Sequence, residues 1–322
     1  MLLSYALKSS VSILKLVRKL NDFMKFGQVT NLDSIEFDLP EIPNRTKELL
    51  NKSTTEKSVK FYFGAPGWSD INYKGNIYPR KTSSAKMLIE YAKQFNSIEF
   101  NGTRYGVPKL STAEKWKDKV NKDFKFSMKL PQFITHRKNI NDIESYQKID
   151  EFLLLWDNIV HYSGVNFAVM ANYFRSNKFN DLAKFVQYWP KEVPLAIELR
   201  DQSWFNLKMS QSWHELFYEN RIIPVITDTP GRRDVLHFNL TNNHLFVRYV
   251  GDFSHESDKK RIEQWVNRIS ELVSMGVNHI WFYVHQPGEN RERILQFYNY
   301  MLPLINTSLD LNIPLLVDYS KA

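Results

Sequence analysis

Eight short β-rich runs, separated by longer segments that mostly carry helical periodicity, constrain the fold of this chain more than any other feature. The runs lie at 59–66, 97–103, 124–130, 165–171, 195–200, 223–228, 244–251 and 279–286. Helical patterns are found at 84–94, 110–120, 146–161, 180–189, 211–220 and 259–275. This alternation over 322 residues predicts an α/β fold, a TIM-type (β/α)8 barrel. A doubly wound open sheet is the alternative, but "GAPGWSD" after the first run is not a phosphate-binding glycine loop.

Residues 59–322 are predicted to form the barrel domain, and residues 1–58 an N-terminal extension and lead-in. The lead-in is polar and proline-bearing, with a short helical stretch at 45–51. Residues 1–20 place leucine, isoleucine and valine at helical spacing between basic residues, so this segment is either a plain extension or a helix on an acidic membrane surface. No run reaches the roughly 20 apolar residues of a membrane span. We expect a cytoplasmic protein.

Composition narrows the chemistry. The chain has no cysteine, which removes disulfides, thiolate metal sites and cysteine nucleophiles. Its formal net charge of +8 would attract anions, but the basic residues are scattered, so nucleic acid is a less favoured partner than a small anionic ligand. Composition indicates nothing about oligomeric state.

Side-chain alternation within each run predicts where the polar residues point. In the second run, Ile98 and Phe100 share one face and Glu99 takes the other. We expect the apolar face of each run to pack on helices and the polar face to look into the barrel. In the sixth run this assignment places Thr227 outside and Asp228 inside. The charged side chains expected to converge at the C-terminal ends of the strands are Glu99, Lys129, Glu198, Arg200, Asp228, Arg248 and His285.

The convergence predicts a binding site. Lys129, Arg200 and Arg248 suit a phosphate or carboxylate, because arginine offers a two-pronged donor. Glu99 or Glu198 is the predicted general base or acid, with Asp228 and His136 assisting. Further predicted ligand-binding residues are Asn101, Tyr105, Trp204 and His285.

Two other interpretations stay open. The charges of this cluster could be structural ion pairs, since buried charges persist when they are paired. Glu99, Glu198, Asp228 and His285 are also the residue types of a divalent-metal site, but no metal-binding spacing supports one, and we predict no cofactor. A non-catalytic nucleotide- or nucleic-acid-binding module and a metal-dependent hydrolase are therefore the alternatives to a barrel enzyme.

Several motifs occur in a characteristic order: "FNSIEFNGTRYGVPK", "FKFSMKLPQFITH", "AIELRDQSWF", "VITDT", "LFVRYVG" and "WFYVHQP". Together they resemble the YecE-like family, catalogued as domain of unknown function 72, in the branch that carries an N-terminal lead-in. The resemblance implies a TIM-type barrel and an enzyme-like pocket, but no reaction. The family's recurring positions correspond to Glu99, Asn101, Tyr105, Lys129, Thr135, His136, Glu198, Arg200, Trp204, Asp228 and Arg248. The eighth strand departs from the usual pattern, because it ends in His285 and Gln286 where many members have paired asparagines.

Overall fold

The computed structural model describes residues 27, 29, 31–52, 58–251, 256–286 and 293–321. Residues 1–26, where an amphipathic extension was predicted, therefore lie outside the described residues. The eight predicted β-rich runs all form strands. Their bounds are β1 Lys60–Gly64, β2 Ser97–Phe100, β3 Lys125–Met128, β4 Asn166–Val169, β5 Leu195–Glu198, β6 Ile223–Asp228, β7 His244–Val250 and β8 His279–His285.

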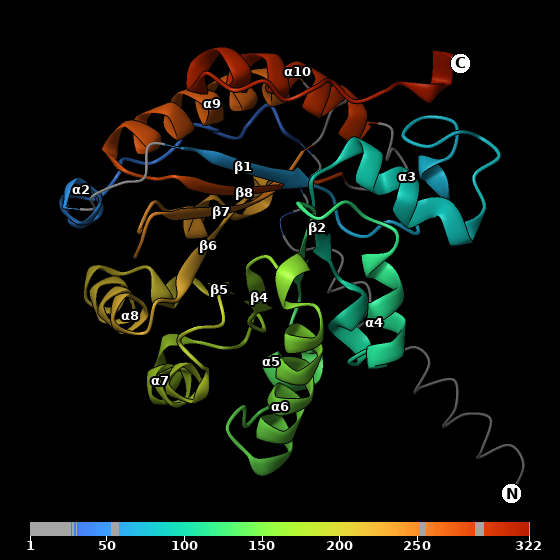
Figure 1. Ribbon diagram of the computed structural model, residues 1–322. Coiled ribbons are helices and arrows are strands. Elements are labelled where there is room, and N and C mark those ends of the chain that lie inside the picture. Colours follow the sequence, from blue (N-terminus) through green and yellow to red (C-terminus); the bar gives the residue numbers. More distant parts are fainter. Residues whose placement is uncertain are drawn as a thin grey trace, which may run out of the picture.

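All the strand pairs are parallel. Six strands form one curled sheet in the order β1-β8-β7-β6-β5-β4, and β2 and β3 form a second, two-stranded sheet (Figure 1). Single parallel bridges from Pro66 to Glu99 and from Lys129 to Phe167 link the small sheet to the large one on its two sides. The predicted α/β class is confirmed. The described strands, however, do not pair into one continuous eight-stranded sheet.

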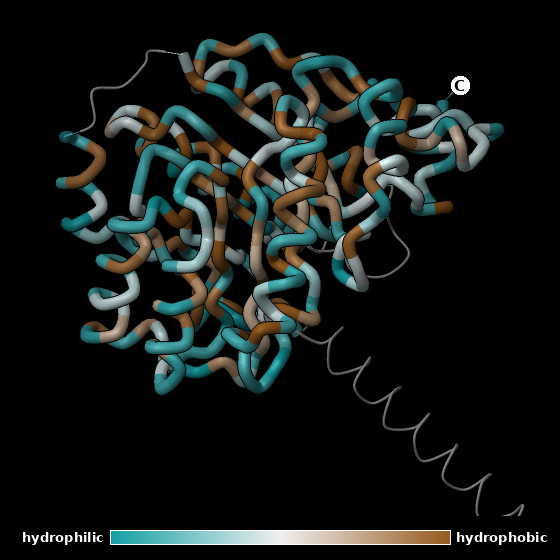
Figure 2. The backbone as a smooth tube through the Cα atoms, turned by 60° about the horizontal axis from the view of Figure 1, so that its bottom comes forward, coloured by the Kyte–Doolittle hydropathy of each residue, from teal (hydrophilic) through white to brown (hydrophobic). Residues whose placement is uncertain are grey.

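Helices surround the strands. They are α2 Asn44–Asn51, α3 Met87–Gln94, α4 Leu110–Lys117, α5 Gln132–Thr135, α6 Ile143–Asn158, α7 Phe179–Tyr188, α8 Leu207–Glu219, α9 Ser257–Met275 and α10 Arg293–Leu309. The predicted stripe of α9 is buried at Ile262, Trp265 and Ile269, as its 3.6-residue period requires. Along the chain, hydrophobic segments gather on the central strands and alternate with hydrophilic ones along the helices (Figure 2).

The apolar core lies in two places. The larger cluster fills the space between strands and helices and includes Ile98, Ile226 and Val247. A smaller cluster lies among the strands themselves, on the concave side of the curled sheet. Its members are Val165, Phe167, Val169, Ala196, Ile223, Val225, Phe246, Trp281 and Tyr283. The concave side is therefore apolar along much of its length, and its charged residues lie toward the C-terminal ends of the strands.

The lead-in covers a part of the sheet where the connection between two strands contains no α-helix. Between β6 and β7 the chain forms only a 3-10 helix, η7 Pro230–Val235, and extended segments. Helix α2 lies between α8 and α9 (Figure 1), and Ile42 and Leu50 join the outer core there. Arg45 donates to Ser210 Oγ of α8 at 3.0 Å, and Arg268 of α9 donates to the Pro40 carbonyl at 2.7 Å. An exposed apolar sheet face must be covered by another element, and the lead-in covers this one.

A buried hydroxyl joins the lead-in to the segment between β6 and β7. Thr46 Oγ1 donates to the Phe238 carbonyl at 2.9 Å and accepts from the Leu240 amide at 3.0 Å. We expect Thr46→Val to lower the free energy of unfolding by about 1–2 kcal/mol, because it removes two buried hydrogen bonds, although the Leu240 amide still donates to the Phe238 carbonyl at 3.1 Å. Urea denaturation measures this. Thr112→Val, at an exposed position of α4, is the control, and equal stability of the two variants would contradict the role of Thr46.

Candidate functional site

Arg248 lies at the centre of the charged residues near the C-terminal ends of the strands. Its side chain projects from β7 onto the concave side, in register with Thr227 and Tyr283. Its Nε and Nη2 donate to the two carboxylate oxygens of Glu99, both at 3.0 Å, and its Nη1 donates to Glu198. One guanidinium thus joins strands β2, β5 and β7 through two carboxylates, in the bidentate geometry that arginine favours.

Glu99 is fully buried and saturated with donors. Besides Arg248, Asn101 Nδ2 donates to its Oε1 at 2.9 Å, and His285 Nε2 lies 2.7 Å from its Oε2. Burial alone would raise the pKa of Glu99, but Arg248 and His285 hold that pKa well below its usual range. Glu99 is therefore a permanent anion at neutral pH.

Glu198 has the same character. Arg200 Nε donates to its Oε1 at 2.6 Å, and Arg248 holds its other oxygen. Burial opposes ionisation, yet Arg200 and Arg248 lower the pKa of Glu198 to about 2. Two guanidinium groups and two carboxylates therefore alternate in a chain of Arg200, Glu198, Arg248 and Glu99. Such carboxylates are weak bases, because protonation would break charge-assisted hydrogen bonds.

Lys129 differs from the other cations of this group. It follows the last residue of β3, on the concave side, and is only 8% exposed. Within the part of the chain that the structure describes, no hydrogen bond or ion pair joins its Nζ to another residue. Burial lowers the pKa of Lys129 to about 7, and the positive charges of Arg248 and Arg200 act in the same direction. We call Glu99, Lys129, Glu198, Arg200, Arg248 and His285 the Arg248 cluster.

His136 lies near the cluster, at the end of α5. Its Nδ1 is 2.8 Å from Thr135 Oγ1, and its carbonyl accepts from the Tyr173 hydroxyl. Burial lowers the pKa of His136 to about 4, helped by the charges of Lys129 and Arg200. The imidazole is neutral at physiological pH.

The expectation that Asp228 joins these residues is wrong. Asp228 is in register with Tyr249, so it points outward to the helices, whereas Thr227 pairs with Arg248 on the concave side. Its carboxylate accepts from Arg233, from the Trp265 indole at 2.6 Å, and pairs with Arg261 of α9 at 2.9 Å. These partners neutralise a fully buried acid outside the cluster and lower its pKa against the effect of burial. The assignment failed because Thr227 and Asp228 are both polar, so alternation alone could not choose between the two faces.

Trp204 and Tyr105 are also placed apart from the cluster. Trp204 is fully buried, and its indole donates to the Phe174 carbonyl at 2.7 Å while its ring stacks on Phe174. It anchors the loop after β5 and offers no free surface to a ligand. Tyr105 is 75% exposed and lies against Arg104.

Two features of this region were missed by reasoning from the sequence. The first is Arg261, a buried cation on the apolar stripe of α9; its place four residues before Trp265 was the available signal. The second is a hydroxyl chain on the concave side, in which Tyr283 OH lies 2.6 Å from Ser97 Oγ and donates to Ser127 Oγ at 2.7 Å. Alternation within their strands places these two serines on the face of Glu99, but their contact with Tyr283 depends on how the strands meet.

The described residues contain no group of three or more histidine, aspartate or glutamate side chains arranged to hold a metal ion. Four residues were considered as metal ligands. Three of them, Glu99, Glu198 and His285, all contact Arg248, whereas Asp228 lies elsewhere. Among the described helices, none has both the length and the apolar character needed to cross a membrane.

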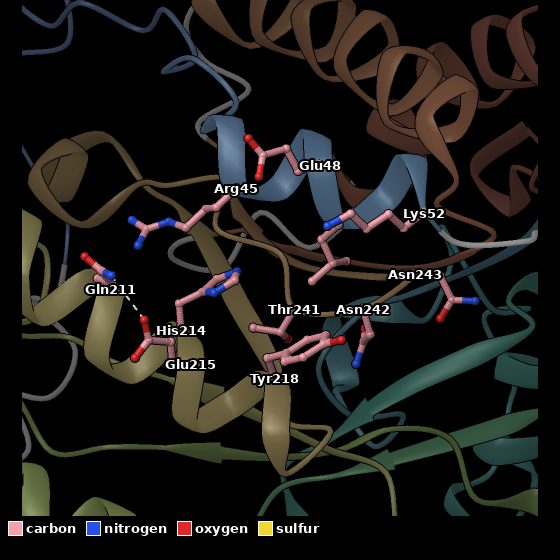
Figure 3. A pocket seen from close by; sticks show the side chains of 11 residues that line it. Arg45, Glu48, Lys52, Gln211, His214, Glu215, Tyr218, Thr241, Asn242 and Asn243 are labelled. Carbon is pink, nitrogen blue, oxygen red and sulfur yellow. Dashed lines mark hydrogen bonds between the residues drawn. The ribbon is translucent and has the colours of Figure 1, made fainter.

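A cavity of about 820 Å³ lies away from this cluster, between α2, α8 and the loop that precedes β7 (Figure 3). Several of its polar groups are already engaged. His214 Nε2 lies 2.8 Å from the Leu240 carbonyl, Arg45 bonds to Asn239 and Ser210, and Gln211 donates to Glu215. The cavity is thus a crevice between α2 of the lead-in, α8 and the loop at the N-terminal end of β7. The Arg248 cluster is the better candidate site, because it brings several charged side chains together at the C-terminal ends of the strands.

The fold and the cluster define an α/β protein with a charged site at the C-terminal edge of a curled parallel sheet. Residues 62–301 match the family described as "Protein of unknown function DUF72", and the chain belongs to that family. The resemblance drawn from the sequence motifs is thereby confirmed.

The chain is also similar to curated proteins of two bacteria. It is 23% identical to UPF0759 protein YecE of Escherichia coli K12, over 65% of this chain and 81% of that protein. It is also 23% identical to UPF0759 protein YunF of Bacillus subtilis 168, over 66% of this chain and 83% of that one. Among solved structures, a DUF72 family protein of Enterococcus faecalis V583 (EF0366) aligns with a TM-score of 0.61 and 20% identity, covering 80% of this chain and 98% of that chain. One of Thermotoga maritima MSB8 (TM1631) gives 0.60 at 20% identity, covering 76% and 98%. These two structures support the fold.

Arg248 is expected to be indispensable for stability. Arg248→Met would leave two buried carboxylates without their shared partner, at a cost of about 3–5 kcal/mol. Arg175→Met, which removes an arginine side chain that is 71% exposed, should cost less than about 0.5 kcal/mol. Urea denaturation of the two variants measures the difference. Adding Glu99→Gln and Glu198→Gln to Arg248→Met should restore part of the lost stability, because the triple variant no longer buries unpaired carboxylates.

The contribution of Arg248 to the stability of the folded protein should depend on pH. Glu99 and Glu198 have lowered pKa values in the folded protein, so their pairing stabilises the fold above their unfolded pKa of about 4.3 and loses its effect as pH falls. The stability gap between the wild type and Arg248→Met should narrow between about pH 5 and about pH 2. A gap that stayed constant or widened on acidification would contradict the ionised state of both carboxylates.

Proposed function

We propose that this protein is a barrel enzyme that binds a small phosphate- or carboxylate-bearing ligand at Lys129, Arg200 and Arg248 and acts on it by acid–base chemistry. The proposal includes closure of the eight strands into a TIM-type barrel. The bridges on both sides of the β2–β3 sheet support closure, as does the backbone hydrogen bond of 2.8 Å from Leu130 to the Phe167 carbonyl. In a closed barrel, the Arg248 cluster occupies the end where such enzymes carry out their chemistry.

The charge balance of the cluster carries the proposal. Two carboxylates, Glu99 and Glu198, face three cationic side chains, Arg200, Arg248 and Lys129. Both carboxylates are already bound to guanidinium groups, so protonated Lys129 adds a positive charge that no described carboxylate neutralises. Burying such a charge is expensive, and an anionic ligand would remove the cost. The observation favours an anion over a neutral or cationic ligand.

Burial also favours a small ligand over a polymer. Lys129, Arg200 and Arg248 are each less than a tenth exposed. Proteins that track a nucleic-acid backbone use cations in open grooves and on surfaces, where successive phosphates can reach them. The nucleotide- or nucleic-acid-binding alternative therefore has less support from this geometry.

The acid–base group that the geometry favours is Lys129, with neutral His136 nearby. A catalytic acid or base works best when its pKa is close to the working pH, and the pKa of Lys129 is about 7. The glutamates first considered for this role are held ionised by arginine. Their proposed part is to hold Arg200 and Arg248 in place, while Lys129 exchanges the proton.

Sulfate is a suitable probe, because it keeps its charge across the relevant pH range. Isothermal titration calorimetry should show sulfate binding that weakens by about tenfold between about pH 6 and about pH 9, as Lys129 loses its proton. Lys129→Met should lose most of this binding at the lower pH. Lys125→Met is the matched control, since Lys125 begins the strand that Lys129 follows and donates to the His161 carbonyl at 2.6 Å. Equal sulfate affinity in both variants would overturn the proposed site.

A further inference from the structure

We propose that Lys129 is a nucleophile whose ε-amine condenses with the carbonyl group of a small anionic substrate, such as a 2-oxo acid or a phosphorylated aldehyde or ketone. This inference rests on the proposed anion site and assigns it a substrate class. Such an enzyme would activate carbonyl compounds through a covalent iminium ion. Lysine can serve in this way when its amine is buried and uncharged.

The backbone of Lys129 is held firmly where the site needs it. Its amide donates to the Phe100 carbonyl of β2 at 3.0 Å, and its own carbonyl accepts from Thr103 Oγ1 at 2.5 Å. The next amide, of Leu130, donates to Phe167 of β4 at 2.8 Å. The residue is thus fixed between two neighbouring strands, and only its flexible side chain is left to move toward a substrate.

Among the residues that the structure describes, the amine of Lys129 has no hydrogen-bond or ion-pair partner. A lysine buried for stability would be expected to take one of the two carboxylates, but Arg248 and Arg200 occupy them through Nε and Nη donors at 2.6–3.0 Å. An apolar side chain would fill the same space without the cost of a buried charge. The combination of enclosure, rigid backbone and an uncommitted Nζ points to a chemical role. The lowered pKa supports it, because a large share of the amine is uncharged at neutral pH.

The neighbours of Lys129 match the rest of such a substrate. The positive charges of Arg200 and Arg248 lie close enough to lower the pKa of Lys129, so they would attract a carboxylate or phosphate attached to the carbonyl carbon. Neutral His136 is on the loop that follows β3 and lies near Lys129. A phosphate or carboxylate held by the arginines would bring the carbonyl carbon toward the amine, which supplies the proximity that the step needs.

The step balances without another reactant. The lone pair of the neutral amine attacks the carbonyl carbon, the π electrons move to the oxygen, and a proton passes from nitrogen to oxygen to give a carbinolamine. A proton taken from solvent then lets the hydroxyl leave as water, and the nitrogen lone pair forms the C=N bond. Overall, amine, carbonyl compound and one proton yield an iminium ion and water.

Reductive trapping tests the inference. The full-length protein is incubated separately with pyruvate, glyoxylate and dihydroxyacetone phosphate in the presence of sodium cyanoborohydride, and adducts are located by intact mass and peptide mapping. We expect one probe to label Lys129 in preference to the other lysines, and excess sulfate to suppress that label. Labelling should increase with pH as the amine loses its proton, which is the opposite of the trend expected for sulfate binding.

Two variants separate this inference from the proposed anion site. Lys129→Arg keeps a cation but has no nucleophilic amine, so it should retain sulfate binding and lose the label. Lys125→Met should retain both. If sulfate binds as expected but Lys129 is labelled no more than exposed lysines by any of the three probes, the nucleophile is wrong and the anion site stands. If neither sulfate binding nor labelling depends on Lys129, both proposals fall.

Discussion

The two-sided pairing of Arg248 with Glu99 and Glu198 is the interaction on which the rest of the site depends. These three residues come from β7, β2 and β5, which are far apart in the sequence, and they meet on the concave side of the strands. Without the carboxylates a buried guanidinium would be prohibitively costly, and without the guanidinium the two acids would repel each other. The same contacts explain why the carboxylates stay ionised although both are buried. The ion pairs considered as a structural alternative are therefore present, and in the proposed function they hold the site in place.

The pairing of the arginines with both glutamates determines which residue of the cluster we propose for acid–base or covalent chemistry. Arg248 and Arg200 saturate both glutamates, so Lys129, which faces the same space, is without a described partner. Its two neighbouring arginines lower its pKa further than burial alone. We propose that structural pairing and chemistry belong to different members of one cluster. A charge that the fold does not neutralise costs stability, and such costs are common at functional sites.

Much of the fold and part of the cluster could be predicted from the sequence. The order of strands and helices followed from periodicity, and alternation placed Glu99, Glu198, Lys129 and Arg248 on one side correctly. Alternation failed at β6, where two adjacent polar residues left the choice of face to Arg261, a partner 33 positions away on α9. The pairing of glutamates with particular arginines depends on strand register, which local patterns do not contain. Nor could local patterns show that the lead-in would lie between α8 and α9 in place of a crossover helix.

The central claim is that Lys129 is a buried amine with no carboxylate partner among the described residues. The most direct measurement is its own titration, followed by NMR on protein carrying carbon-13 at the lysine ε position, with the Lys129→Arg variant used to assign the signal. The account predicts that the Lys129 resonance titrates near pH 7 and moves to higher pH when sulfate is added. A Lys129 resonance that titrates near the ordinary lysine value of 10.5, with or without sulfate, would contradict it.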